Sequence, residues 1–178
     1  MPTRILIEGR PGTGKTTAAR RLAGLLRSRE VTGFTTAEIR QHGTRVGFAL
    51  ETLAGERAVL AHVDLPGPPR VGRYGVDLGV MERLALPALE SAGARPSAGR
   101  RAVVLIDELG RMELACSPFR EAVRAVFDAE VDVVATVHAH HDPFTDALKR
   151  RTDVVLVHLT PVNRDTLAER LAALLEES

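Results

Sequence analysis

Residues 9–16 read Gly-Arg-Pro-Gly-Thr-Gly-Lys-Thr, which fits the pattern G-x-x-x-x-G-K-[ST] of a phosphate-binding loop. The run before it, Ile5-Leu6-Ile7, is apolar and predicts a buried strand. From Thr17 to about Leu26, apolar residues recur at helical spacing. The pattern requires this order of strand, glycine loop and helix, so it favours an α/β fold with the loop at the end of a buried strand.

The residue types in the loop determine what it can bind. Glycines let backbone N–H groups converge on phosphate oxygens, and the N-terminus of the following helix adds unpaired donors and partial positive charge. Lys15 is expected to reach the β- and γ-phosphates, and the Thr16 hydroxyl to bind Mg²⁺. The alternative is a glycine-rich turn that happens to contain a lysine. The predicted nucleotide-binding residues of this segment are Gly9, Arg10, Pro11, Gly12, Thr13, Gly14, Lys15, Thr16 and Thr17.

A pair of acidic residues follows a second apolar run. Residues 102–106 read Ala-Val-Val-Leu-Ile and end in Asp107 and Glu108. A carboxylate at a strand end is typical of the Mg²⁺ site that accompanies a phosphate loop, so Asp107 joins Thr16 as a predicted metal residue, acting through water. Glu108 is predicted to be catalytic, because many NTP-hydrolysing proteins keep a carboxylate there that polarises the attacking water. The structural alternative is a pair of loop or helix-capping carboxylates.

Charge that develops on a transferred phosphoryl group needs cations, and arginine is a frequent choice. Arg111 is predicted to be catalytic with Lys15 and Glu108, because its place just past Glu108 keeps it near the metal. Glu113 is expected either to orient Arg111 or to face solvent. The other arginine candidates are Arg10, Arg73, Arg150 and Arg151, although most arginines of the chain must be solvated surface.

The segment before the last predicted helix is a candidate base-binding site. Asn163 and Arg164 follow Thr160-Pro161 there, at a position that often holds the base in kinase-like P-loop folds. Stacking by Arg164 would tolerate any base. An equally simple interpretation makes Asn163 the N-cap of the helix.

Three histidines, His138, His140 and His141, follow the predicted strand 131–137. A zinc site is not expected, because no cysteine lies nearby and no H-x-E or H-E-x-x-H pattern is present. His138, at the strand end, is instead a candidate sensor of the γ-phosphate, and the other two are expected in a solvated loop.

The rest of the chain alternates strands with helices, which indicates one domain, 1–178, with a mainly parallel sheet covered on both faces. With the glycine loop at the end of a buried strand, we therefore predict a three-layer α/β/α fold. Short segments within 38–63, separated by glycine-containing turns, predict a small antiparallel β insertion. Further strands are expected at 31–36, 131–137 and 154–159, helices at 79–91 (interrupted by Pro87), 117–129 and 142–150 and from Asn163, and loops at 64–75 and 91–101.

Asp64-Leu-Pro-Gly67 competes with Asp107 for the role of the second phosphate-site motif, because it matches the D-x-x-G of GTPases. That pattern is weak, and no [NT]-K-x-D motif for reading guanine accompanies it: of the 24 lysines and arginines, only Lys15 and Lys149 are lysines. We interpret Asp64 as a loop residue.

Composition narrows the class of protein. The net charge of +1 and the aromatic content of 3% argue against nucleic acid as a main partner. The chain shows no signal peptide and no apolar run near 18 residues, so no membrane is expected and a cytoplasmic location is the default. The expected partners are nucleoside triphosphates, and no feature identifies a protein partner.

The chain also resembles the cancer-related nucleoside-triphosphatase family, small P-loop NTPases well represented in thermophiles. The resemblance implies a P-loop NTPase fold of the RecA or kinase type. It also implies slow, Mg²⁺-dependent hydrolysis of NTPs to NDPs and phosphate with loose base preference. The family pattern often has lysine where Arg111 stands, and either residue supplies positive charge. The matching stretches, in family order, are 9–17, 33–40, 45–48, 71–76, 106–114 (Ile-Asp-Glu-Leu-Gly-Arg-Met-Glu-Leu) and 163–165.

Three functions remain open at this point. The first is an NTPase in which Glu108 aligns water. The second is a kinase of nucleotides, nucleosides or other small molecules, whose acceptor pocket would lie in 38–75. The third is a non-enzymatic switch or adaptor that binds nucleotide without turnover.

Overall fold

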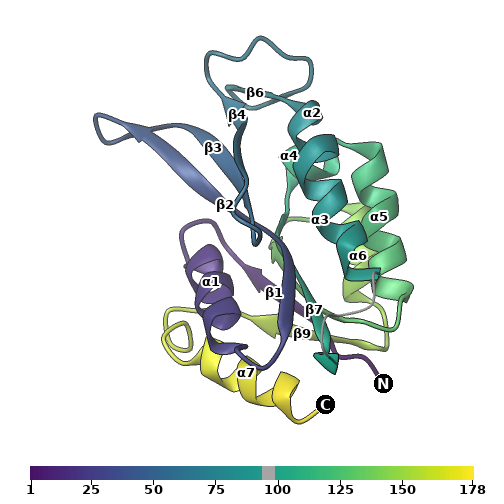
Figure 1. The fold of residues 1–178 in the computed structure, drawn as a ribbon. Helices are drawn as coiled ribbons and strands as arrows, with labels where there is room; N and C mark the ends of the chain where they lie inside the picture. Colours follow the sequence, from purple (N-terminus) through teal and green to yellow (C-terminus); the bar gives the residue numbers. More distant parts are fainter. Residues whose placement is uncertain (94–98) are drawn as a thin grey trace.

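The computed structural model describes residues 1–93 and 99–178, so residues 94–98 of the expected 91–101 loop lie outside the described part. Within it, the strands form one mixed sheet in the order β5-β6-β4-β3-β2-β7-β8-β1-β9, with helices on both faces (Figure 1). The strands are β1 (Arg4–Gly9), β2 (Glu30–Gln41), β3 (Thr44–Thr52), β4 (Arg57–His62), β5 (Arg70–Val71), β6 (Tyr74–Val76), β7 (Ala102–Leu109), β8 (Asp132–His138) and β9 (Val154–His158).

The helices complete a three-layer arrangement. One layer is formed by α1 (Lys15–Leu25) and α7 (Leu167–Glu176), whose apolar residues share a core with one face of β1, β7 and β8. The other face is covered by the remaining longer helices, so the predicted α/β/α architecture is confirmed. The remaining helical segments are α2 (Leu78–Val80), the π-helix η1 (Met81–Ala85), α3 (Leu86–Glu90), the 3₁₀ helix η2 (Ser91–Gly93), α4 (Arg111–Leu114), α5 (Ser117–Asp128) and α6 (Pro143–Lys149).

Strands β2, β7, β8, β1 and β9 are parallel and form the half of the sheet that carries the phosphate loop. Their apolar runs are continuous because both faces are covered, and every residue of β8 is buried. The carboxyl ends of these strands meet at one edge, where Gly9 pairs with His138 in register.

The antiparallel part of the sheet differs from the expected insertion in its extent. Strand β2 is one continuous strand: its first residues, 30–34, pair in parallel with β7, and residues 34–41 pair antiparallel with β3. The separate strands expected at 31–36 and 38–40 are therefore one. Antiparallel pairing continues through β4, β6 and β5, and so extends to Val76.

Helix boundaries show where local signals were sufficient. The helix expected at 142–150 is α6, and Asp142 caps it: its carboxylate accepts hydrogen bonds from the N–H groups of Phe144 and Thr145 (2.9 and 3.2 Å). Helix α5 begins at Ser117, where the helix expected at 117–129 begins, and Cys116 occupies the N-cap position. Pro87 follows the π-helix η1, whose wider turn accommodates a residue without an N–H.

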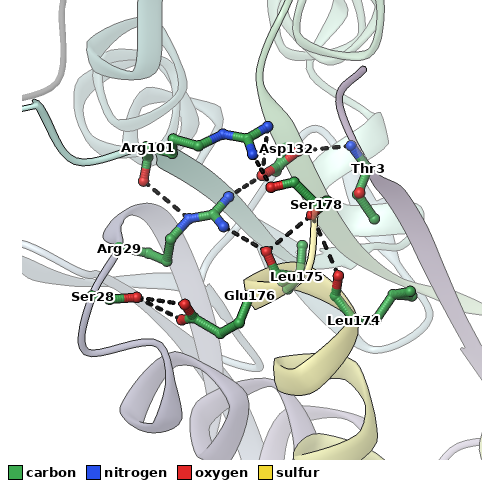
Figure 2. Close-up of polar contacts among 9 residues, drawn as sticks. All are labelled: Thr3, Ser28, Arg29, Arg101, Asp132, Leu174, Leu175, Glu176 and Ser178. Carbon is green, nitrogen blue, oxygen red and sulfur yellow. Dashed lines mark hydrogen bonds and ion pairs between the residues drawn. The ribbon is translucent and has the colours of Figure 1, made fainter.

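A buried ion pair closes the opposite edge of the sheet, where the parallel strands begin (Figure 2). The side chains of Arg29 and Asp132 are 5% and 1% exposed, and Asp132 also accepts a hydrogen bond from the Thr3 N–H (2.7 Å). Arg29 further donates to the carbonyls of Leu175 (2.6 Å) and Arg101 (3.3 Å). This amino-end cluster, defined as Thr3, Arg29, Arg101 and Asp132, joins the starts of β1, β2, β7 and β8 to helix α7. In the described residues, no helix is both long and apolar enough to cross a membrane.

Candidate active site

The phosphate loop connects β1 to α1 at the carboxyl edge of the parallel strands. Gly12 and Gly14 have φ values of +79° and +99°, in the left-handed region that glycine adopts readily. The N–H and hydroxyl of Thr13 both donate to the Arg10 carbonyl (3.2 and 2.7 Å) and close the turn. The N-terminal N–H groups of α1, an 11-residue helix, therefore face the concave side of a short, internally bonded loop.

Lys15 is 9% exposed and lies between the loop and the acidic pair. Its Nζ donates to the Gly9 carbonyl (2.7 Å) and lies 3.3 Å from Glu108 Oε2. These contacts use two of the three ammonium protons, which leaves one donor for a phosphate oxygen. The structure thus brings together Lys15 and Glu108, which are far apart in the sequence and were predicted to be catalytic.

Asp107 is 1% exposed and is surrounded by neutral donors. The Thr16 hydroxyl donates to Oδ2 (2.8 Å), as does the Thr36 N–H (3.2 Å), and the Thr136 hydroxyl donates to Oδ1 (2.7 Å). Burial raises the pKa of Asp107, and these three hydrogen bonds oppose the rise. The predicted metal pair of Thr16 and Asp107 is therefore in contact.

Sequence reasoning missed Thr136 and the Thr36 backbone as partners of Asp107. Thr136 had a signal, because it is the one polar residue within the apolar run 133–137. The Thr36 N–H had none, because any residue except proline supplies an N–H at that position of β2.

Glu113 corrects an expectation about the acidic residues. Glu113 was expected either to orient Arg111 or to face solvent; it is buried, and among the described residues it forms no ion pair with Arg111. A Cβ atom built on Gly110 would lie 2.9 Å from Glu108 Oε1 and 3.0 Å from Glu113 Oε2, so both carboxyl groups border this glycine. Burial, and then the charge of Glu108, hold the pKa of Glu113 well above its usual value.

Arg111 begins α4, the helix that follows the Asp107-Glu108 pair, and its side chain is exposed. No hydrogen bond or ion pair engages its guanidinium within residues 1–93 and 99–178. This cation is three residues past Glu108 in the sequence, and its predicted catalytic role stays a prediction.

The segment with Asn163 and Arg164 adjoins the phosphate loop, because the Leu159 N–H donates to the Glu8 carbonyl (2.7 Å). Asn163 does not cap α7, which begins four residues later at Leu167. Its amide instead bonds within the turn: Nδ2 donates to the His158 carbonyl and Oδ1 accepts from the Thr160 N–H, both at 2.8 Å. Arg164 is exposed.

Two sequence alternatives can be placed on the fold. Asp64 is exposed in the turn after β4, so it is a loop residue, as interpreted from the sequence. Its strand is far from β1 in the sheet, because four strands lie between them: β3, β2, β7 and β8. His138 is the last residue of β8, and His140 and His141 follow the strand; the rings of His138 and His140 lie 5.6 Å apart. In the described part of the chain, no group of three or more His, Cys, Asp or Glu residues is arranged to hold a metal.

Comparison with known proteins identifies the family to which the chain is similar. A family model described as NTPase matches residues 4–172. The chain is 43% identical over 173 residues to a nucleoside-triphosphatase THEP1 of Thermotoga sp., covering 97% of this chain and 95% of the relative.

Two solved structures share the whole fold. The crystal structure of THEP1 from Aquifex aeolicus superposes with a TM-score of 0.89 at 38% identity, covering 98% of this chain and 99% of that one. The solution structure of a human cancer-related nucleoside triphosphatase gives a TM-score of 0.85 at 35% identity, covering 99% of this chain and 98% of that one. The chain belongs to this nucleoside-triphosphatase family.

Proposed function

We infer that this site hydrolyses nucleoside triphosphates to nucleoside diphosphates and phosphate, with water as the acceptor. One observation carries the inference: the Glu108 carboxylate lies 3.3 Å from the ammonium group of Lys15, at the mouth of the phosphate loop. A lysine of this loop contacts the β- and γ-phosphates, so a carboxylate beside it lies where water must approach the γ-phosphorus.

In the proposed reaction, Glu108 accepts a proton from water as the water oxygen bonds to the γ-phosphorus. The bond between that phosphorus and the bridging oxygen breaks, and the oxygen leaves on the diphosphate. Lys15 and the N–H groups of the loop stabilise the charge on the phosphate oxygens, and Arg111 supplies a further cation.

The donor atoms around Asp107 fit Mg²⁺ as the cofactor. Mg²⁺ prefers hard oxygen ligands and is usually held by one or two protein groups together with phosphates and waters. The Thr16 hydroxyl donates its proton to Asp107, so its lone pairs remain available, and the three partners of Asp107 carry no charge. Bound there, Mg²⁺ supplies positive charge that offsets the charge of the phosphate oxygens.

Loose base preference is supported by the turn that adjoins the loop. The Asn163 amide is used by backbone groups of the turn itself, so it does not read a base edge. Exposed Arg164 can stack on any base, because every base has a π-face. We therefore expect ATP, GTP, CTP and UTP all to serve as substrates.

Membership of the nucleoside-triphosphatase family and the position of Glu108 both favour hydrolysis over the two alternatives, a small-molecule kinase and a nucleotide-binding switch. A small-molecule kinase needs an acceptor hydroxyl where water attacks, and a nucleotide switch needs no carboxylate beside the phosphate lysine. Phosphate release without an added acceptor separates the three functions.

The test measures phosphate release from each of the four NTPs with and without Mg²⁺, for the wild type and Glu108→Gln. We expect multiple turnovers with Mg²⁺ and a loss of about 10²–10⁴-fold in Glu108→Gln with nucleotide binding retained. Glu121→Gln, an exposed change on α5, is the matched control and should turn over normally. Nucleotide binding without phosphate release by the wild type would contradict hydrolysis and favour a kinase or a switch.

A further inference from the structure

His138 is a buried polar side chain that the proposed reaction does not use, although its place at a strand end made it a candidate sensor of the γ-phosphate. It is the last residue of β8, it is 7% exposed, and it pairs in register with Gly9, the first residue of the phosphate loop. Neither of its ring nitrogens has a hydrogen-bond partner within the described residues. An unpartnered buried donor costs free energy, so a ring in this state calls for a ligand that would pair with it.

The strand geometry directs this side chain to the phosphate side of the sheet. Alternate residues of a strand share a face, so His138 shares one with Val134 and Thr136. Val134 packs in the core cluster formed with α1, and the Thr136 hydroxyl donates to Asp107. Helix α1 and the loop that leads into it therefore lie on the His138 side.

The strand end that carries His138 is held in place by the other lysine of the chain. Lys149 Nζ donates to the His138 carbonyl (3.1 Å) and forms an ion pair with Glu8 Oε2 (2.5 Å). These contacts fix the backbone at the end of β8 beside the residue that precedes Gly9. The imidazole is thus held in position while its own nitrogens remain unpaired.

The electrostatic surroundings favour a neutral ring. Burial lowers the pKa of His138, and His140 and Lys149 lower it further, whereas Glu108 and Asp142 oppose the shift. A neutral imidazole keeps one N–H donor, which is what a phosphate oxygen requires.

We propose that His138 binds the terminal phosphate group of a nucleoside triphosphate, by donating an imidazole N–H to one of its non-bridging oxygens. The residue lies between the strand that carries Glu108 and the strand that leads into the loop, because β8 separates β7 from β1. His138 therefore distinguishes triphosphate from diphosphate. This inference rests on the proposed function of the same site.

The test compares the affinities for ADP and for a non-hydrolysable ATP analogue, both with Mg²⁺, by calorimetry. His138→Phe keeps a ring of similar size but removes the donor, and His138→Gln restores a side-chain N–H. We expect His138→Phe to lower the affinity for the analogue by about tenfold and to leave the affinity for ADP unchanged. His138→Gln should recover part of the lost affinity. His140→Ala, an exposed neighbour, is the matched control and should behave like the wild type.

The outcomes separate this inference from the proposed function. A His138→Phe protein that binds the analogue like the wild type overturns the role of His138, while hydrolysis by the wild type still supports the function. An equal loss of affinity for ADP and for the analogue also overturns the role of His138 in binding the terminal phosphate. Such a result would mean that His138 shapes the loop, which affects both ligands. If the wild type binds neither nucleotide, the proposed function fails first, and the inference fails with it.

As a second readout, the His138 ring nitrogens can be followed by NMR in the wild type. Their chemical shifts should change when the ATP analogue is added and much less with ADP. Equal changes for the two ligands would contradict a contact with the terminal phosphate.

Discussion

The two edges of the parallel sheet both bury charged groups, but they treat them differently. In the amino-end cluster, Asp132 meets the guanidinium of Arg29, so the buried carboxylate has a cationic partner (Figure 2). At the carboxyl edge, Asp107 is also buried, but within the described residues its hydrogen-bond donors are two hydroxyls and a backbone N–H.

Buried carboxylates with a structural role and those with a functional role differ in their partners. A carboxylate paired with arginine is complete and holds the fold together, whereas a carboxylate held only by neutral donors still lacks a counter-charge. The same edge also holds Glu113, whose pKa is raised by burial, and His138, whose ring nitrogens have no hydrogen-bond partner within residues 1–93 and 99–178. These buried polar groups, each of which lacks a charged partner or a hydrogen-bonding partner within the described residues, therefore lie at the carboxyl edge, where the nucleotide is expected.

The largest effect is expected from removing Lys15, the buried cation of the carboxyl edge. Lys15→Ala should lower kcat/KM for ATP by about 10³-fold, which corresponds to ~4 kcal/mol in the barrier, because it removes a donor aimed at the transferred phosphate. Phosphate release at substrate concentrations below KM measures this loss. A melting temperature that falls sharply in the same variant would indicate a structural role for Lys15 instead.

The equivalent change at the amino edge should affect stability and spare catalysis. Asp132→Asn leaves Arg29 buried without its counter-charge, so the free energy of unfolding should fall by about 3 kcal/mol. Urea denaturation measures this loss. At a temperature where the variant is fully folded, its kcat should match the wild type; a lowered kcat would show that the two edges are coupled.

A smaller effect is expected from the free cation beside the acidic pair. Arg111→Ala should lower kcat by about tenfold, ~1.4 kcal/mol, and change ADP affinity little, because its charge acts mainly on the transition state. Arg57→Ala, an exposed arginine of β4, is the control. Equal kcat values in the two variants would exclude Arg111 from the reaction.

The smallest effect concerns the pH dependence of stability. The pKa of Glu113 is raised in the folded state, so the folded protein keeps this proton at pH values where the unfolded chain has lost it. The free energy of unfolding should therefore fall as pH rises above about 4.3, the ordinary pKa of glutamate. Glu113→Gln cannot ionise, so it does not lose stability in this way. The melting temperature of the variant minus that of the wild type should therefore increase from pH 5 to pH 8, by ~2–4 °C for each 1 kcal/mol of unfolding free energy that the wild type loses. A constant difference would contradict the raised pKa.

Residues that act through local sequence could be predicted, and residues that act through register could not. The loop at 9–16 and the pair Asp107 and Glu108 follow apolar strands, so their places at the carboxyl edge were evident from the sequence. The α/β/α layers could be predicted for the same reason, because apolar strands alternate with helices along the chain.

The contacts of Thr136 and the burial of Glu113 depend on which strands are neighbours and how they are aligned. Local pattern does not fix either property, since β7 and β8 pair over a separation of nearly thirty residues. The continuity of β2 was missed for the same reason: residues 34–41 find their partner in β3, while residues before them pair with β7. A single strand with two kinds of neighbour looks in sequence like two short ones.

The sheet order also determines when the site can exist during synthesis. Strand β1 is made first, but its neighbours in the sheet are β8 and β9, which begin at Asp132 and Val154. A nascent chain that has not reached Asp132 already contains the loop, Lys15 and both acidic residues, but neither strand that flanks the loop. Because such long-range pairings form late in folding, nucleotide binding should appear in one step near the end of translation, and a shortened chain should not retain a weak version of it.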